Sequence, residues 1–153
     1  MKASGDMHTE QKMAITNEFQ PTGFFDADVW GRAIIDLLLI NHERKAAVIV
    51  DWKFGKMKDD WAQLDLFICF IAVYFPELES YAASFYWAKE KKFVTKKVKR
   101  EDVPELWNGI LPRIARLDNA IKTTDFPANP SGLCKKYCNV TSCVHHGVGG
   151  GGW

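Results

Sequence analysis

Two aspartates and a lysine are the residues of this chain best suited to chemistry. Asp36 interrupts the apolar segment 33–40, and Asp51 comes near the end of a second apolar segment, 46–53. A charged side chain inside a buried segment is costly unless it is paired or bound to a metal. Both aspartates therefore need a partner, and Lys53 is close to Asp51 in the sequence.

The expected pairing of the two segments brings these residues together. Both are predicted strands, and a four-residue loop would place Asn41 opposite Ala46 in an antiparallel pair. Asp36 then lies directly opposite Asp51, with Cβ atoms roughly 4.5–5.5 Å apart. Two carboxylates at that distance repel each other unless a divalent cation lies between them. Because side chains alternate along a strand, Lys53 shares the face of Asp51.

One sheet face with two carboxylates and a lysine suits the hydrolysis of a phosphodiester. A bound cation neutralises the phosphate and acidifies water, and the lysine stabilises developing charge or orients the nucleophile. The alternative is that Asp36 and Asp51 form a salt-bridged cluster with Lys53 or simply end strands, since an Asp-x-Lys triplet is common. The second buried acid at matching depth favours the metal site.

Three motifs of the chain resemble those of the PD-(D/E)XK nuclease superfamily, particularly its RecB-like and phage-encoded exonucleases. The motifs are Gly31-Arg-Ala-Ile-Ile-Asp36, Val50-Asp-Trp-Lys-Phe-Gly-Lys56 and Gln63-Leu-Asp-Leu-Phe67. They are similar to the family's Gly-x-x-Asp strand, its Asp-Tyr-Lys-Thr-Gly signature and its Gln-containing helix. Gly31 stands further from Asp36 than in the usual pattern, and Trp52 and Phe54 replace the commoner Tyr and Thr. The resemblance covers roughly residues 10–90, together with a cysteine-rich tail.

This resemblance implies roles for single residues. Asp36 and Asp51 would ligate Mg²⁺ or Mn²⁺ together with the backbone carbonyl of Trp52. Lys53 would be catalytic, and Gln63 would support the site or contact DNA. For Gln63 the alternative is an ordinary polar position on a helix.

The first strand supplies less than the family pattern contains. Glu10 would match an acidic residue on the family's first strand, with a solvated strand charge as its alternative. Related enzymes often carry an N-terminal helix whose His or Glu completes the metal shell. Only His8 and Glu10 stand in that region here, so we expect either reduced activity or a partner subunit that supplies the missing part.

A dense group of soft metal ligands lies near the C-terminus. The group consists of Cys134, Cys138, Cys143, His145 and His146. Zinc takes four S or N ligands tetrahedrally, so we expect a structural Zn²⁺ site in this tail. An iron–sulfur cluster, as in some RecB-like nucleases, and reduced metal-free thiols are the alternatives. Cys69 lies within an apolar run and is expected to be a buried helix residue.

Positive charge is concentrated between residues 89 and 100. On an edge hairpin it forms a rim suited to DNA phosphates, with a solvated edge that resists aggregation as the alternative. The lysines expected to contact DNA are Lys56, Lys91, Lys92, Lys96 and Lys97. The aromatic residues 85–87 are expected in the core, with stacking on bases as the alternative.

Composition and pattern set the fold class. The chain has 153 residues, of which 47% are hydrophobic and 25% charged, and its net charge is +1, which is ordinary for a globular domain. Strands are predicted at 10–16, 33–40, 46–53, 81–88 and 93–98, the second and third buried on both faces. Helices are predicted from Asp59 or Asp60 to Phe75 and over 103–121, the latter kinked at Pro112. This order predicts an α/β fold, and the resemblance implies a restriction-endonuclease-like central mixed sheet flanked by helices.

We expect a nuclease-like domain at 1–126, a Cys/His metal-binding tail of the same domain at 127–147 and a flexible Gly-rich terminus at 148–153. The N-terminus has no apolar signal region and the longest apolar run is too short to span a bilayer, so the protein is expected in the cytoplasm, or the host cytoplasm if phage-encoded, without a membrane partner. The expected function is a metal-dependent DNA exonuclease in phage or bacterial recombination, repair or replication. A homo-oligomer or a partner replication or recombination protein would fit this class. The alternatives are a catalytically silent DNA-binding module on the same fold and a zinc-stabilised interaction protein.

Overall fold

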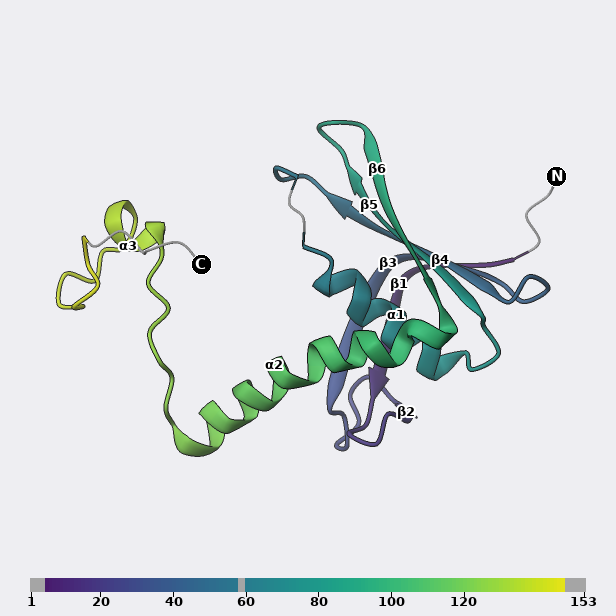
Figure 1. The fold of residues 1–153 in the computed structure, drawn as a ribbon, viewed down its shortest axis with the longest axis horizontal. Helices are drawn as coiled ribbons and strands as arrows, with labels where there is room; N and C mark the ends of the chain where they lie inside the picture. The colour runs from purple at the N-terminus through teal and green to yellow at the C-terminus, as the bar shows by residue number, and fades with distance from the viewer. Residues whose placement is uncertain (1–4, 58–59, 148–153) are drawn as a thin grey trace. The chain divides into compact units, whose positions relative to one another are not determined.

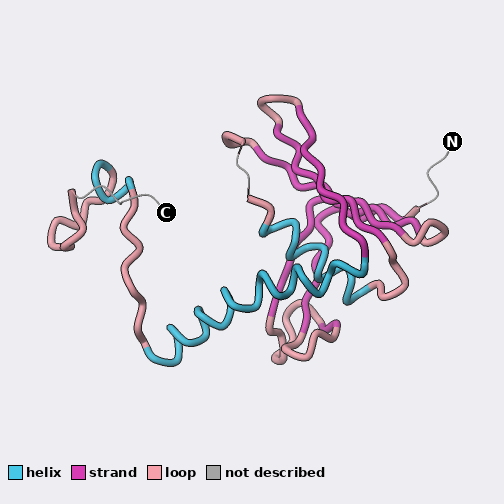
Figure 2. Tube along the Cα trace, in the orientation of Figure 1, coloured by secondary structure: helices cyan, strands magenta, loops and turns pink. Residues whose placement is uncertain are grey.

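Six strands of the described chain form one mixed β-sheet (Figures 1 and 2). The structure is a computed structural model that describes residues 5–57 and 60–147. The strands are β1 (Asp6–Ile15), β2 (Pro21–Thr22), β3 (Gly31–Asn41), β4 (Ala46–Lys53), β5 (Ser80–Trp87) and β6 (Lys92–Lys99). Their order is β2-β1-β3-β4-β5-β6, and only β4 and β5 run parallel within it. The predicted α/β fold with a central mixed sheet is confirmed.

The helices follow the strands much as the sequence predicts. They are α1 (Ala62–Tyr74), α2 (Val103–Thr123) and α3 (Gly132–Lys136), with a short 3₁₀ turn at Arg100–Asp102 leading into α2. The N-cap of α1 is Trp61, so the prediction of Asp60 as the cap is wrong by one residue; Asp60 Oδ1 still accepts a hydrogen bond from the backbone N–H of Ala62 at 3.1 Å. Its predicted alternative, Asp59, lies outside the described residues. In the described parts of the chain, no helix is both long enough and apolar enough to cross a membrane.

The turn between β3 and β4 sets the register on which the site depends. Asn41 pairs with Ala46, as predicted, and the antiparallel ladder continues for five pairs. The four residues of the turn are held by Asn41, whose Oδ1 accepts a hydrogen bond from the N–H of Arg44 at 2.8 Å. In this register the position after the last pair is Asp36 opposite Asp51.

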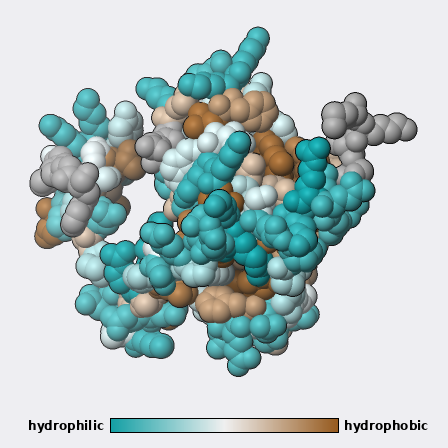
Figure 3. Space-filling view, turned by 45° about the vertical axis from the view of Figure 1, so that its right-hand side comes forward, coloured by the Kyte–Doolittle hydropathy of each residue, from teal (hydrophilic) through white to brown (hydrophobic). Residues whose placement is uncertain are grey.

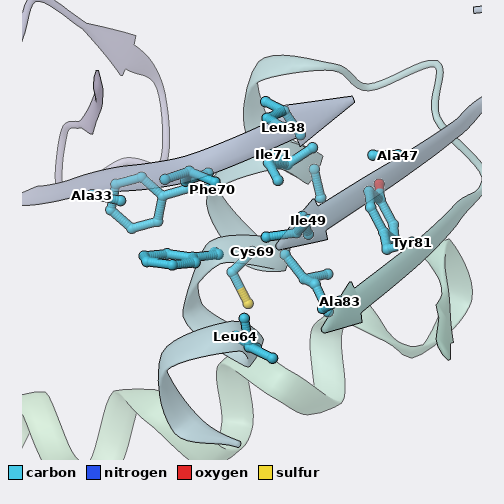
Figure 4. Close-up of a cluster of buried hydrophobic side chains, with 14 of the residues drawn as sticks. Ala33, Leu38, Ala47, Ile49, Leu64, Cys69, Phe70, Ile71, Tyr81 and Ala83 are labelled. Carbon is cyan, nitrogen blue, oxygen red and sulfur yellow. The ribbon is translucent and has the colours of Figure 1, made fainter. Parts of the chain in front are cut away.

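One face of the sheet carries the hydrophobic core. Figure 4 shows Ile49 of β4 and Ala83 of β5 on the side of Leu64 and Cys69 of α1, and all four side chains are buried. Helix α1 is apolar around most of its circumference, with seven buried residues among its thirteen. The start of α2 adds partly buried side chains to the same cluster. The prediction of Cys69 as a buried helix residue is confirmed.

The opposite face of the sheet is more open than predicted. The segments 33–40 and 46–53 are predicted to be buried on both faces, but Ile34 is 48% exposed, Val48 37% and Trp52 42%. That part of the prediction is wrong. A continuous apolar run is typical of a covered strand, yet a sheet with antiparallel strands can face water on one side.

The chain divides into two compact units, Met1–Arg113 and Ile114–Trp153. The second unit contains the end of α2 and the short helix α3, which Ser131 caps by accepting a hydrogen bond from the N–H of Leu133 at 3.3 Å. Leu117 and Ile121 in α2 are 56% and 58% exposed, so this part of the predicted apolar stripe is not buried in a core. The predicted Gly-rich terminus at 148–153 lies outside the described residues.

The Tyr74 hydroxyl joins the end of α1 to the sheet, and its removal should weaken the fold. It donates to the carbonyl of Ala14 at 2.7 Å, accepts from the N–H of Ala14 at 3.0 Å and lies 3.2 Å from the carbonyl oxygen of Thr22. We expect Tyr74→Phe to lower the free energy of unfolding by about 1–3 kcal/mol, because buried backbone groups lose their partner. Urea unfolding measures this. Tyr137→Phe, at a residue 73% exposed, is the control, and equal stability of the two variants would contradict the expectation.

Candidate active site

Asp51, Lys53 and Gln63 form a closed set of polar contacts at the end of β4. Gln63 Nε2 donates to Asp51 Oδ1 at 2.8 Å, and Lys53 Nζ donates to Gln63 Oε1 at 2.7 Å. The same ammonium lies 2.7 Å from Asp51 Oδ2. Strand β4 supplies two of these residues and the first turn of α1 supplies the third, so the start of the helix is fixed against the end of the strand.

The Lys53 ammonium is held from several sides without being enclosed. Besides Asp51 and Gln63, it lies 5.2 Å from the ring centroid of Phe85, within the range of a cation–π interaction. The side chain is nevertheless 30% exposed. Lys53 is thus positioned by its neighbours and remains accessible to a ligand that enters from solvent.

Asp51 is a carboxylate in a largely apolar place. It is 4% exposed, and burial raises its pKa; the charge of Asp36 raises the pKa further, while Lys53 and Gln63 lower it in part, so that the net direction is upward. Its Oδ2 atom is buried and accepts no hydrogen bond from any described residue. The Lys53 ammonium lies 2.7 Å from that atom as its ion-pair partner.

Asp36 lies where the pairing of β3 and β4 stops. Its Oδ2 accepts a hydrogen bond from the backbone N–H of Trp52 at 3.0 Å. A side-chain oxygen of β3 therefore binds a backbone group of β4 just past the ladder, which ends at the pair before Asp36 and Asp51. The regular pairing of the two strands thus ends at the position where two like charges would face each other.

Glu10 of β1 stands beside Asp36, on the side of β3 away from β4. Thr9 pairs with Leu37, so the next position places Glu10 opposite Asp36, and the β1–β3 ladder is interrupted at that pair. The backbone of Glu10 has φ 50°, a left-handed conformation that is uncommon for a residue other than glycine. Glu10, Asp36 and Asp51 are thus successive members of one row across β1, β3 and β4.

The row does not bring three metal-ligating side chains together. In residues 5–57 and 60–147, no group of three or more Asp, Glu, His or Cys side chains could hold a metal ion, and Glu10 is exposed. Asp36 and Asp51 nevertheless fit a divalent cation, because the buried Oδ2 of Asp51 has no hydrogen bond in the described chain. Hard cations such as Mg²⁺ are commonly bound by one or two carboxylates, with water and phosphate oxygens completing the shell.

A pocket of about 300 Å³ opens beside the Lys53 ammonium. Phe85 and Trp87 line it; they are 4% and 5% exposed, which agrees with their predicted place in the core. Lys56 and Asp60 also line the pocket. The sequence indicates Asp60 only as a possible helix cap. Its place beside the end of β4 could not be predicted, because the sequence around it has no periodic hydrophobic pattern.

A comparison with known protein families agrees with this geometry. The profile of the PD-(D/E)XK nuclease superfamily matches residues 2–143. The chain belongs to the PD-(D/E)XK nuclease superfamily. Members of this superfamily are typically nucleases and generally use Mg²⁺ or Mn²⁺. In a search of curated proteins, no protein matches the chain.

The lysines expected to contact DNA in this superfamily member are placed in two ways. Lys96 lies 2.6 Å from Asp65 of α1, so its charge holds β6 against the helix on the core side of the sheet. The others are exposed: Lys56, Lys91, Lys92 and Lys97. The prediction could not separate these cases, because the contact of Lys96 joins residues 31 positions apart.

The cysteine-rich tail does not gather its candidate ligands. In the part of the chain that the structure describes, Cys134, Cys138, Cys143, His145 and His146 form no group that could hold a metal ion. The segment is closed instead by its backbone, as the N–H of Gly147 donates to the carbonyl of Cys134 at 3.0 Å. The structure therefore gives no support to the predicted zinc or iron–sulfur site, since a dense cluster in sequence need not converge in space.

The four thiols should differ sharply in reactivity. Burial raises the pKa of Cys69 to about 12, and Asp65 adds to this effect while Lys96 opposes it; the thiolate is the reactive form. We expect iodoacetamide at pH 8 to modify the three tail cysteines of the metal-free native protein and Cys69 only after unfolding. Peptide mass spectrometry measures this. Modification of Cys69 as fast as that of the exposed Cys143 would contradict it.

The stability of the metal-free protein should reveal the strain at Asp51. Because its pKa is raised in the folded chain, the native state holds this proton more tightly than the unfolded state, and stability falls as the pH rises through the raised pKa. Asp51→Asn can still accept the hydrogen bond from Gln63 and lacks this charge.

In EDTA, we therefore expect the wild-type free energy of unfolding to fall relative to that of Asp51→Asn as the pH rises above the ordinary pKa of an aspartate. Urea unfolding at a series of pH values measures the difference. Asp118→Asn, at an exposed aspartate, is the control. A difference between wild type and Asp51→Asn that does not change with pH would show that Asp51 is not strained.

Proposed function

We propose that this chain is a Mg²⁺- or Mn²⁺-dependent deoxyribonuclease that hydrolyses phosphodiester bonds from DNA ends. The observation that carries the proposal is the buried Asp51 carboxylate. Its Oδ2 accepts no hydrogen bond from the described residues, and Asp36 stands at the next strand in the same row. Such a pair of carboxylates is compensated best by a divalent cation.

The residues divide the chemistry between them. Asp36 and Asp51 would hold the ion, with the backbone carbonyl of Trp52 as a further ligand. When bound, the ion neutralises the phosphate and lowers the pKa of a coordinated water. Lys53 donates from the pocket side to a phosphate oxygen and stabilises the charge that develops there.

Gln63 acts as a positioning residue in this proposal. Its amide donates to Asp51 and accepts from Lys53, so it fixes the carboxylate and the ammonium relative to each other. Substrate phosphates would contact the exposed lysines Lys56, Lys91, Lys92 and Lys97. Lys96, which is paired with Asp65, would contribute to the shape of the surface more than to binding.

The biological setting is proposed from the sequence motifs. Their resemblance to RecB-like and phage-encoded exonucleases favours a role in DNA recombination, repair or replication. Glu10 would enter the metal shell by a change of side-chain conformation, or a second subunit or partner protein would complete it. The tail cysteines and histidines would bind structural Zn²⁺, or an iron–sulfur cluster, after rearrangement, and metal analysis of the purified protein tests this.

A catalytically silent DNA-binding module is the second candidate. The observation that favours it is the incomplete set of metal ligands among the described residues. Both candidates place DNA on the same surface and differ in whether Asp51 and Lys53 support turnover.

End-labelled linear DNA with Mn²⁺, and then with EDTA, separates the two candidates. We expect wild-type protein to shorten linear DNA only with the metal, leaving closed circular DNA intact. Asp51→Asn and Lys53→Met should each slow the cleavage by about 10²–10³-fold, since each removes a group that stabilises transition-state charge. Lys45→Met, which removes a lysine paired with Glu79 outside the site, should cleave normally. Intact DNA with every metal would refute the nuclease and favour the silent module.

A further inference from the structure

Three aromatic side chains form a row on the sheet face opposite the candidate active site. Trp52 of β4 pairs with Tyr86 of β5, and Tyr86 pairs with Phe93 of β6. The ring centroids of Trp52 and Tyr86 are 5.3 Å apart, and those of Tyr86 and Phe93 are 4.7 Å apart. We call Trp52, Tyr86 and Phe93 the aromatic row.

The face of the row follows from the alternation of side chains along each strand. Asp51 and Lys53 contact Gln63 of α1, so Trp52 between them points away from that helix. The neighbours of Tyr86 on β5 are buried in the core at 4% and 5% exposure, so Tyr86 also points away. The row therefore lies on the open face of the sheet.

The rings of the row are accessible. Trp52 is 42% exposed and Phe93 is 54% exposed, and Tyr86 is half-buried between them. A folded protein rarely leaves adjacent large aromatic side chains in water, and such a patch usually marks a binding surface. The contacts within the row also hold the rings in place, which lowers the entropy lost when a flat ligand stacks on them.

The β5–β6 turn brings positive charge to this end of the sheet. Strands β4 and β5 end here, β6 begins here, and the β5–β6 turn lies at the top of Figure 1. In Figure 3 strongly hydrophilic residues stand beside hydrophobic surface at the same end. The residues of the turn and its edges that carry charge are Lys89, Lys91 and Lys92, against Glu90 alone.

We propose that the aromatic row binds the unpaired bases of single-stranded nucleic acid, while the lysines of the β5–β6 turn contact its phosphates. Stacking on exposed rings is available to every base but requires a strand whose bases are not already paired. The inference rests on the proposed function in taking nucleic acid as the substrate. It deepens that proposal by making an unpaired strand the preferred ligand at the end of the sheet where Lys53 lies.

The charge around the row favours nucleic acid over a protein partner. The buried centres of protein interfaces are depleted in lysine, whereas the β5–β6 turn, which joins the strands of Tyr86 and Phe93, carries the exposed Lys89 and Lys91. Lysine next to aromatic side chains is the combination found in grooves that follow a phosphate backbone and stack its bases. A protein partner is therefore an outcome for the test.

Fluorescence anisotropy with a labelled oligothymidylate in EDTA tests the inference without cleavage. Phe93→Leu and Tyr86→Leu keep an apolar side chain and remove the ring, so we expect each to weaken binding about tenfold. Phe93→Trp should restore the affinity, and binding to a blunt duplex should change little in any variant. Phe25→Leu, which removes a ring that is 82% exposed and contacts Phe24, is the matched control.

Wild-type affinity in both leucine variants would overturn the inference. So would a change of oligomeric state in Phe93→Leu, seen by sedimentation, with unaltered affinity for the oligothymidylate, because the row would then be a protein interface. Cleavage that persists while the leucine variants bind normally refutes the aromatic row alone. Ring-dependent binding of the oligothymidylate without any cleavage refutes the proposed nuclease and leaves the row in place.

Discussion

The Asp51 carboxylate is almost completely buried, and the elements around it supply what such a group needs. An isolated buried charge is far too costly to persist, so it must be paired, hydrogen-bonded or bound to a metal. Lys53 two residues along β4 supplies the opposite charge, and Gln63 from the first turn of α1 supplies a hydrogen bond. The position of α1 against the sheet is thus tied to the same carboxylate that gives the site its chemistry.

The sheet itself is modified around this group. The β1–β3 ladder lacks the pair of Glu10 and Asp36, and the β3–β4 ladder ends just before Asp36 and Asp51. An Asp36 oxygen binds a backbone N–H of β4 instead. Regular pairing would bring like charges face to face, which destabilises a sheet. In this row the Oδ2 atom of Asp51 accepts no hydrogen bond from the described residues, although the Lys53 ammonium lies 2.7 Å from it. A bound cation would offset the repulsion between the carboxylates of this row.

Much of this arrangement could be predicted from the sequence because it depends on counting. The four-residue turn fixes the register of β3 and β4, and the register fixes which residues face Asp36. The contact of Gln63 with both Asp51 and Lys53 could not be predicted by counting residues, because it depends on where α1 begins and how it packs on the sheet. The family resemblance supplied the expectation that Gln63 supports the site, and the packing of α1 supplied its place.

The predictions that were wrong or unsupported depend on contacts between distant parts of the chain. Apolar strands look alike whether one face or both are covered, so the open face with Trp52 was not expected. The sequence predicts a DNA contact for Lys96, because it does not show that Lys96 pairs with Asp65 on another element. The cysteines of the tail are close in sequence, yet metal binding needs convergence of side chains, which composition does not report.

Binding of Mn²⁺ in solution, followed by electron paramagnetic resonance of the free ion, tests the central claim most directly. If Asp36 and Asp51 are compensated by a cation, the wild-type protein should remove free Mn²⁺ from the spectrum at a single site. Asp36→Asn should weaken that binding by at least about tenfold, because one carboxylate ligand is lost. Asp118→Asn should bind as the wild type does. No binding by the wild type, or equal binding by Asp36→Asn, would contradict the account.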